Sequence, residues 1–170
     1  RSFNALDVLM IRELWMLEIY ERLGTHCLET VDEVVSLEHD QRDKGRLRLV
    51  SESGVEVRLF LERGKPLVVG EYLKAECGKI VQVKGAVEAI AHASCEDWRT
   101  FSRACYHLGN RHVKLQVGER WLRIKPDYVL EEMLHLLGLV ISHENAVFEP
   151  ESGAYKVAKE HNSGHGHHDH

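Results

Sequence analysis

The 170-residue sequence predicts an α+β protein with an all-β first half, a second half in the order β-α-β-β-α-β, and a disordered histidine-rich tail. Apolar residues alternate with period two in the first half, whereas two helical periods appear in the second half. The apolar pattern disappears after Tyr155. We therefore expect domains at 16–84 and 85–155, followed by a flexible tail at 156–170.

The composition limits which classes of partner we expect for this chain. Apolar residues make up 44% of it, which is enough for a folded core, and the net charge of −5 gives no electrostatic reason to bind nucleic acid. No apolar run approaches the roughly 18–20 residues that cross a bilayer, so we expect no membrane partner and a cytoplasmic location.

The first fifteen residues do not continue this pattern. Asp7, Arg12 and Glu13 interrupt the apolar run there and exclude the core of a secretion signal. Met16 resembles a true start that leads directly into a strand. We therefore interpret 1–15 as an upstream or non-native extension.

The all-β half contains a recognisable hairpin. Residues 46–50 and 55–61 both alternate between polar and apolar, and Ser53-Gly54 between them is typical of a turn. Another short strand is expected at Ile80–Val83, and no helical period of useful length appears before residue 85.

The second half begins with a strand at Ala86–Ala91 and a helix that Ser94 opens, with Asp97 in a capping-box position. Gly109-Asn110 is expected to end this helix, because both residues tolerate the left-handed conformation. The apolar face of the helix comprises Trp98, Phe101, Ala104, Cys105 and Leu108.

Strands at Val113–Val117 and Trp121–Ile124 follow, then a helix from about Asp127 to Gly138 and a last strand from Val140 to about His143. This order predicts a ferredoxin-like domain, with two helices on one face of a four-stranded sheet. The core face of the second helix is predicted to be Val129, Leu130, Met133, Leu134 and Leu137.

Histidine is the unusual component, because five of the twelve lie in the last ten residues. Neutral imidazoles bind Ni²⁺, Cu²⁺ and Zn²⁺, and the glycines between them let the backbone wrap around an ion. A purification tag is an alternative interpretation, although tags are usually an uninterrupted run. The candidate ligands are His161, His165, His167, His168 and His170.

His112 is a further candidate ligand. It precedes the strand expected at Val113–Val117 and is in phase with its polar residues, which predicts that it projects from the open face of the sheet beside Trp121 and Arg123. If a second copy met this face across a two-fold axis, two His112 side chains would share one ion. From the pattern alone, a surface histidine at a strand edge is the favoured interpretation of this position.

The sequence does not indicate an enzyme. Cys105 and His107 lie two residues apart on a helix, so their side chains diverge and cannot form a catalytic dyad. No cysteine pair has the spacing of a zinc knuckle.

The run from Cys105 to His112 (Cys-Tyr-His-Leu-Gly-Asn-Arg-His), together with Phe148-Glu-Pro-Glu-Ser-Gly-Ala-Tyr155 and the histidine-rich end, resembles the UreE family of nickel metallochaperones for urease maturation. The resemblance extends from Met16 to the C-terminus. The His-x-His pair that some members carry before the second helix is replaced here by Pro126-Asp127-Tyr128, so we expect no metal site built on that pair.

The resemblance implies a β-rich, peptide-binding-like first domain and a ferredoxin-like domain that forms a homodimer. It implies that His112 binds Ni²⁺ at the dimer interface, that tail histidines add ligands, and that Zn²⁺ or Cu²⁺ competes in vitro. The implied partners are the urease apoprotein and accessory proteins that include a GTPase.

Two other functions remain open on the sequence alone. One is a general metal store in which the tail alone binds metal, and the other is a peptide-binding interaction module whose histidines are incidental.

Overall fold

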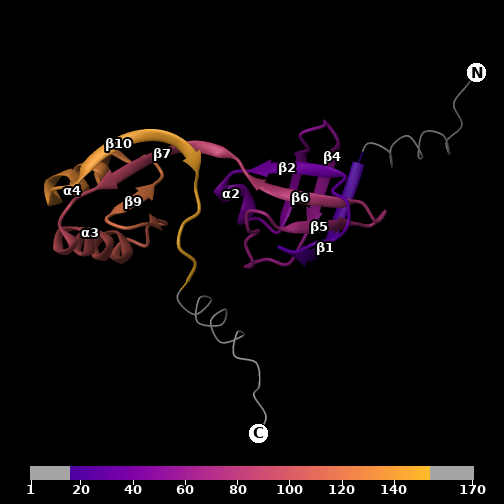
Figure 1. The fold of residues 1–170 in the computed structure, drawn as a ribbon, viewed down its shortest axis with the longest axis horizontal. Helices are drawn as coiled ribbons and strands as arrows, with labels where there is room; N and C mark the ends of the chain where they lie inside the picture. Colours follow the sequence, from indigo (N-terminus) through magenta and orange to yellow (C-terminus); the bar gives the residue numbers. More distant parts are fainter. Residues whose placement is uncertain (1–15, 154–170) are drawn as a thin grey trace, which may run out of the picture. The chain divides into compact units, whose positions relative to one another are not determined.

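The computed structural model describes residues 16–153 and divides the chain into two compact units, Arg1–Glu88 and Ala89–His170. Figure 1 shows the strands and helices of each unit. Of the predicted features, the extension at 1–15 and the histidines of the tail lie outside the described residues.

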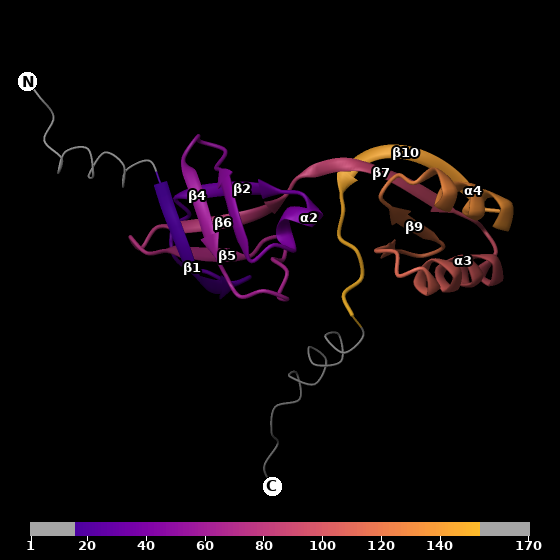
Figure 2. The ribbon, with the colours of Figure 1, turned by 180° about the vertical axis from the view of Figure 1, so that it is seen from behind.

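The first unit is built on one six-stranded sheet with the order β2-β6-β5-β1-β4-β3. β1 runs parallel to β4, and β2 runs parallel to β6, while the other pairs are antiparallel. Figure 2 shows this sheet from behind. Its strands are β1 (Met16–Gly24), β2 (Glu33–Leu37), β3 (Arg46–Val50), β4 (Glu56–Phe60), β5 (Tyr72–Ala75) and β6 (Ile80–Gly85).

The predicted hairpin is present in this sheet as β3 and β4. The Ser51 amide donates a hydrogen bond to the Val55 carbonyl oxygen (2.8 Å), and Gly54 takes a positive φ of 96° in the turn. Only a residue without Cβ adopts that conformation at little cost, which is why the turn forms at this glycine.

Alternation along the strands fills the core of the first unit. Leu17 and Ile19 of β1 and Val57 and Leu59 of β4 point to the same side and are at most 1% exposed. The same cluster continues through the remaining strands and the loops: Val35, Leu37, Leu61, Leu67, Leu73, Ala75, Val81 and Val83.

One helix of this unit was not predicted. α2 (His39–Arg42) is a single turn closed by a capping box, in which the Glu38 amide donates to the Gln41 side chain at 2.9 Å. Four residues are too few to show a helical period, so the apolar pattern gave no signal for it.

The second unit follows the predicted element order. It contains β7 (Val87–Ser94), whose first residues belong to the first unit, then α3 (Trp98–Asn110), β8 (Gln116–Val117), β9 (Trp121–Ile124), α4 (Tyr128–Leu137) and β10 (Val140–Val147). The strands form one sheet with the order β10-β7-β9-β8, so β10 and β8 are its two edges.

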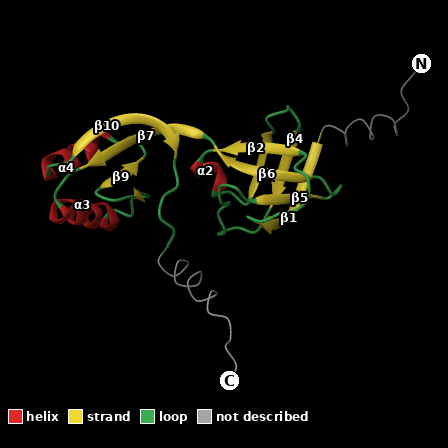
Figure 3. Ribbon diagram, viewed as in Figure 1, coloured by secondary structure: helices red, strands yellow, loops and turns green. Residues whose placement is uncertain are grey.

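Both helices pack on the same face of this sheet (Figure 3). Ala93 of β7 and Leu122 of β9 are paired in register and lie beneath them. The buried side chains that the helices contribute are Phe101, Ala104 and Leu108 from α3 and Leu134 from α4.

Several details of the second unit differ from the sequence prediction. Ser94 does not open the first helix but ends β7, and α3 begins at Trp98 with Asp97 as its N-cap. The strand expected at Val113–Val117 is only Gln116–Val117, and the last strand extends to Val147. Gly109 and Asn110 lie within α3 rather than after it. Two residues assigned to the helical core faces, Trp98 and Val129, are exposed by 53% and 70%.

Candidate functional site

His112 lies in the turn that ends α3, with an exposed side chain. The amide of Arg111 donates to the Leu108 carbonyl oxygen at 3.1 Å, and the amide of Val113 donates to the same oxygen at 3.2 Å. Between these two residues His112 has a φ of 54°, in the left-handed region. This arrangement is the helix end that usually places glycine at the left-handed position.

The prediction that His112 directly precedes a strand at Val113–Val117 and shares the phase of its polar residues is therefore wrong. Residues 113–115 are not part of β8, so strand alternation does not determine where the His112 ring points. His112 instead belongs to the turn at the helix end, between Leu108, which is completely buried, and Val113, which packs on the core. The prediction that this imidazole is free of its own core nevertheless agrees with its exposure.

The histidine that does lie beside Trp121 is His92. Its ring stacks on Trp121 with centroids 5.6 Å apart, and the Arg123 guanidinium lies 5.0 Å from the centroid of the same indole. Arg123 also pairs with Glu144 of β10 at 2.7 Å. Sequence reasoning missed His92, although its alternation with the apolar residues Ala91 and Ala93, both buried here, was a signal that could have placed it on this face.

An apolar hollow of about 360 Å³ lies between the end of α3 and the outer side of α4. Leu136 and Val129 line it and are 80% and 70% exposed. Polar side chains lie at the same hollow, among them Arg111, which immediately precedes His112. Exposed large apolar side chains that gather at one hollow are typical of surfaces where another molecule binds.

The segment after β10 reaches the other edge of the sheet. Phe148 is completely buried, and the amide of Glu151 donates to the Leu115 carbonyl oxygen at 2.8 Å. The amide of Glu149 donates to Oε1 of Gln116 at 3.3 Å. The last described residues, ending at Gly153, therefore lie beside the segment that links His112 to β8.

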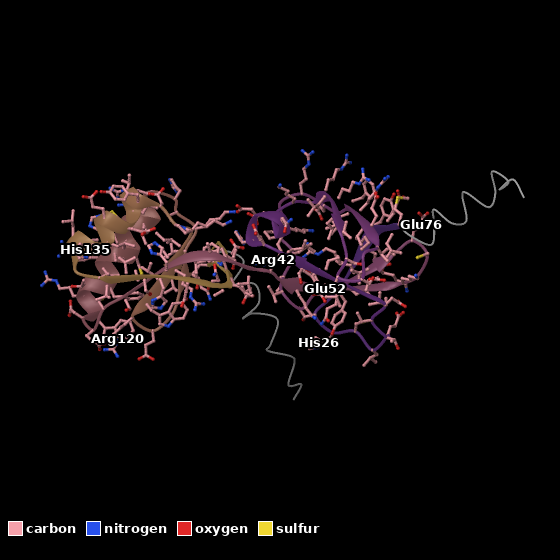
Figure 4. All side chains as sticks on the ribbon, turned by 90° about the horizontal axis from the view of Figure 1, so that it is seen from above. His26, Arg42, Glu52, Glu76, Arg120 and His135 are labelled. Atoms are coloured by element: carbon pink, nitrogen blue, oxygen red, sulfur yellow. The ribbon has the colours of Figure 1, made fainter. Side chains whose placement is uncertain are left out.

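Three further histidines of the second unit lie within the described residues, namely His143, His135 and His107. His143 pairs with Glu131 through an Nε2–Oε2 distance of 2.8 Å. His135 is exposed on the outer side of α4, as Figure 4 shows. His107 lines the apolar hollow and contacts Tyr106 edge to face.

No complete metal site forms within residues 16–153, because no group of three or more His, Cys, Asp or Glu side chains gathers there. A single imidazole such as that of His112 can supply at most about a quarter of a four- to six-coordinate metal shell. A metal site at His112 would therefore need further ligands from residues outside this range or from a second chain.

Cys105, the first residue of the signature, does not have the lowered pKa of an activated nucleophile. Burial raises the pKa of the Cys105 thiol above its usual value, and the nearby Cys95 raises it further. A raised pKa leaves less of the reactive thiolate at neutral pH.

Within the described part of the chain, no helix is both long enough and apolar enough to span a membrane.

Family models match nearly the whole chain. The model described as "UreE urease accessory protein, N-terminal domain" matches residues 19–86, and the one described as "UreE urease accessory protein, C-terminal domain" matches residues 88–170. His112 and the apolar hollow fall within the second match.

Relatives that are named urease accessory protein UreE agree with the family models. The protein from Marinomonas sp. (strain MWYL1) is 70% identical over 90% of this chain and 100% of its own length. The Alteromonas mediterranea protein is 52% identical over 89% of this chain and 95% of its own length. The Psychromonas ingrahamii protein is 47% identical over 89% of this chain and 99% of its own length.

These matches confirm the resemblance that the signature from Cys105 to His112 predicted, and they show an accessory role in urease maturation rather than an enzymatic one. The chain belongs to the UreE urease accessory protein family.

Proposed function

We propose that this chain is a nickel metallochaperone that binds Ni²⁺ as cargo at His112 and delivers it to the urease apoprotein. The observation that carries the proposal is the exposed imidazole at the end of α3, held on a left-handed residue next to an apolar hollow. An uncommon backbone conformation kept at one residue is typical of functional positions.

A homodimer is the assembly that this surface favours. Val129 and Leu136 supply exposed apolar area, and Arg111 and Glu132 supply opposite charges on the same hollow. A two-fold axis through such a surface pairs each charge with its opposite on the second copy. His112 follows Arg111 directly, so this axis would bring the two imidazoles toward one shared ion.

The tail histidines complete the coordination shell in this proposal. The candidates are His161, His165, His167, His168 and His170, and about 15 residues span roughly 20 Å as a flexible coil. A ligand on a flexible arm loses conformational entropy when it binds, which weakens the site. A weaker arm releases its cargo faster, as delivery requires.

Nickel selectivity does not follow from affinity, because Cu²⁺ binds similar nitrogen sites more tightly. We propose that the supply of metal and the protein partners select Ni²⁺ in the cytoplasm. The proposed partners are the urease apoprotein and the accessory proteins that include the GTPase. Zn²⁺ and Cu²⁺ are expected to compete for the site in vitro.

The domain roles follow the same proposal. The strand order β10-β7-β9-β8, in which the fourth and first strands of the unit are neighbours, supports a ferredoxin-like assignment for the metal-binding and dimerising domain at 85–155. The β-rich domain at 16–84 is proposed to bind a peptide segment of a partner.

Calorimetric titration of Ni²⁺ tests the proposal on three chains. Deleting 160–170 is expected to leave one weaker nickel site per dimer, whereas His112→Ala is expected to remove that site. His135→Ala is the matched control, because His135 is also an exposed histidine of the second unit. Loss of all binding on tail deletion, with unchanged binding in His112→Ala, would show a metal store instead.

A test of delivery separates the peptide-binding alternative. Urease activation in cells is expected to fall in His112→Ala and to persist in His135→Ala. Full activation by His112→Ala would favour a peptide-binding module.

A further inference from the structure

Helix α3 carries positive charge and no negative charge. Its thirteen residues, Trp98–Asn110, include Arg99 and Arg103 but neither aspartate nor glutamate, and Arg111 follows the last of them directly. The whole chain has a net charge of −5, so this helix has the opposite sign to the rest of the sequence.

Helical spacing brings three exposed side chains of α3 into line. Arg99, Arg103 and Tyr106 are separated by four and three residues, so they lie on one side of the helix. All three are exposed, Tyr106 by 66%. The buried residues of α3 lie on its opposite side, and in Figures 1 and 2 no other helix or strand of the second unit covers the outer side. We call these three residues the stripe.

The positive charge of the stripe is largely unbalanced within residues 16–153. Neither of its arginines forms a salt bridge with a described residue, whereas Arg120 of the same unit pairs with Glu96 at 3.1 Å. The pKa of Asp97 is lowered mainly by hydrogen bonds from Thr100, and the charge of Arg99 contributes only a smaller part. The stripe therefore offers two guanidinium groups to another molecule.

Arg99 also stands where the helix itself disfavours a cation. The first turn of a helix is the positive end of its dipole, so acidic side chains stabilise it and basic ones do not. α3 has no acidic residue in its first turn, whereas α4 has Glu131 there. Helix stability therefore does not explain the arginine at this position.

The residue types of the stripe fit an acidic protein surface. Arginine and tyrosine are enriched among the residues that contribute most of the binding energy at protein interfaces. Side chains spaced by four and three residues on a helix contact one partner together. Nucleic acid is the other class of polyanion, but a chain with a net charge of −5 is repelled by a phosphate backbone as a whole.

The stripe leads toward the proposed nickel ligand. A helix rises about 1.5 Å per residue, so Arg103 lies about 10 Å along the axis from Asn110, and His112 is two residues further. No residue of the stripe lines the apolar hollow that is proposed as the dimer interface. A partner along the stripe would therefore reach the end of α3 without displacing the second copy.

We propose that the stripe is the docking surface for the protein that receives nickel from His112, and that this protein presents an acidic surface to it. The inference rests on the proposed function, because it assumes that His112 holds the cargo. A negative surface raises the local concentration of cations. The carboxylates that pair with the two arginines would therefore also draw Ni²⁺ toward the receiving protein.

Reversing both charges tests this docking surface in cells. The double variant Arg99→Glu/Arg103→Glu is expected to lower urease activation at least about tenfold, because its carboxylates would face an acidic partner. The fold should tolerate the change, since the helix dipole favours glutamate in the first turn. Arg99→Lys/Arg103→Lys keeps both charges and should activate urease to within about threefold of the unchanged chain.

Lys44→Glu/Arg63→Glu is the matched control. It makes the same change in net charge at two exposed residues of the first unit. This control variant is expected to activate urease like the unchanged chain. Equal losses in the two charge-reversed variants would mean that net charge, and not the stripe, controls activation, and would overturn the docking proposal.

Nickel titration and sedimentation velocity separate docking from metal binding. Arg99→Glu/Arg103→Glu is expected to bind Ni²⁺ no more weakly than the unchanged chain and to remain dimeric. Loss of nickel binding or of the dimer would mean that the arginines belong to the metal site or to the dimer interface, and would overturn the docking proposal.

The activation assay also distinguishes failure of the docking proposal from failure of the proposed function. Full activation by Arg99→Glu/Arg103→Glu, when His112→Ala fails to activate, would overturn the docking proposal and leave the proposed function intact. Full activation by His112→Ala would instead refute the proposed function.

A cell extract distinguishes an acidic protein from nucleic acid as the molecule that the stripe binds. The difference in urease activation between Arg99→Glu/Arg103→Glu and Lys44→Glu/Arg63→Glu is expected to persist after the extract is treated with nuclease. If the treatment abolishes that difference, the stripe binds nucleic acid and the docking proposal is wrong.

Discussion

Val113 and Leu108 are joined by a backbone hydrogen bond of 3.2 Å that closes the end of α3 over His112. Both residues are tied to the core, since Leu108 is completely buried and Val113 packs against the same cluster. The chain between them has to turn, and His112 makes that turn with a φ of 54°. The proposed nickel ligand therefore occupies the position where glycine is usually the most stable residue.

Replacing His112 with glycine should therefore stabilise the fold while removing metal binding. A side chain in the left-handed conformation costs about 1 kcal/mol, and part of that gain is offset by the greater flexibility of glycine in the unfolded chain. We expect His112→Gly to raise the free energy of unfolding by about 0.5–1 kcal/mol. Urea unfolding of the metal-free protein measures this.

His112→Ala is the matched control for this comparison. Alanine also lacks the imidazole but keeps the unfavourable conformation, so its stability should stay at or below that of the unchanged chain. A glycine variant no more stable than the alanine variant would mean that the helix end holds no conformational cost at His112.

The sequence predicted most of the second unit, because most of the apolar residues that repeat there with a helical or strand period do face the core. Trp121–Ile124 is the strand that was expected, and Gly138 ends α4 in the left-handed conformation with a φ of 102°. The residues Gly109 and Asn110 near the end of α3 misled the prediction. They stay helical, and the buried side chain of Leu108 brings the turn to His112 instead.

The spacing of apolar residues along the sequence does not distinguish side chains that a partner would cover from side chains of the chain's own core. Val129 has the period of the α4 core face but is 70% exposed. It lines the hollow beside Arg111 together with Leu136, which the helical period left out of the core face. A pattern of apolar residues reports which side chains avoid water, and it does not report whether their own chain or a second one covers them.

Leu136→Glu should weaken dimerisation. Leu136 is 80% exposed and lines the hollow proposed as the interface, so a carboxylate there would be buried without a partner on association. We expect the dissociation constant of the dimer to rise at least about tenfold. Sedimentation velocity over a range of protein concentrations measures it.

Val140→Glu controls for the added charge on this unit. Val140 is also apolar and 71% exposed, but it lines a different hollow, beside Tyr128 and His143. The Val140→Glu variant should therefore leave the dimer intact. Equal dissociation of both variants would place the interface elsewhere or spread it over both hollows.

Breaking the pair of Arg22 and Glu71 should destabilise the first unit. Two hydrogen bonds join the side chains, at 2.5 Å and 2.8 Å, and the Glu71 side chain is only 4% exposed. Arg22 also donates to the carbonyl oxygens of Lys65 and Pro66, so it holds that loop as well. Since removal of Arg22 leaves a buried carboxylate, we expect Arg22→Ala to cost about 2–4 kcal/mol.

Thermal and urea unfolding measure that loss, and Arg48→Ala is the control within the same sheet. Arg48 pairs with Glu56 at 2.9 Å but is 71% exposed, so water replaces the pair at little cost. Similar losses for the two variants would mean that burial does not determine the strength of these pairs.

The N-terminus of α3 should weaken in acid because its cap is a carboxylate. Asp97 accepts a hydrogen bond from the Thr100 amide at 2.7 Å, and hydrogen bonds from Thr100 hold the pKa of Asp97 below its ordinary value of 3.8. A carboxyl whose pKa is lower in the folded chain stabilises it at pH values above that ordinary value. The contribution is lost as the pH falls through the lower, folded pKa.

Asp97→Asn isolates this effect, because the amide still accepts a bond from Thr100 but does not titrate. The stability difference between the unchanged chain and Asp97→Asn should be constant from pH 7 to about 5 and should shrink below about pH 4. Urea midpoints of the two chains measured together give that difference, since every other carboxyl is common to both. A difference that does not change down to pH 2 would show that the charge of Asp97 contributes nothing to the cap, and would leave hydrogen bonding alone to explain where α3 begins.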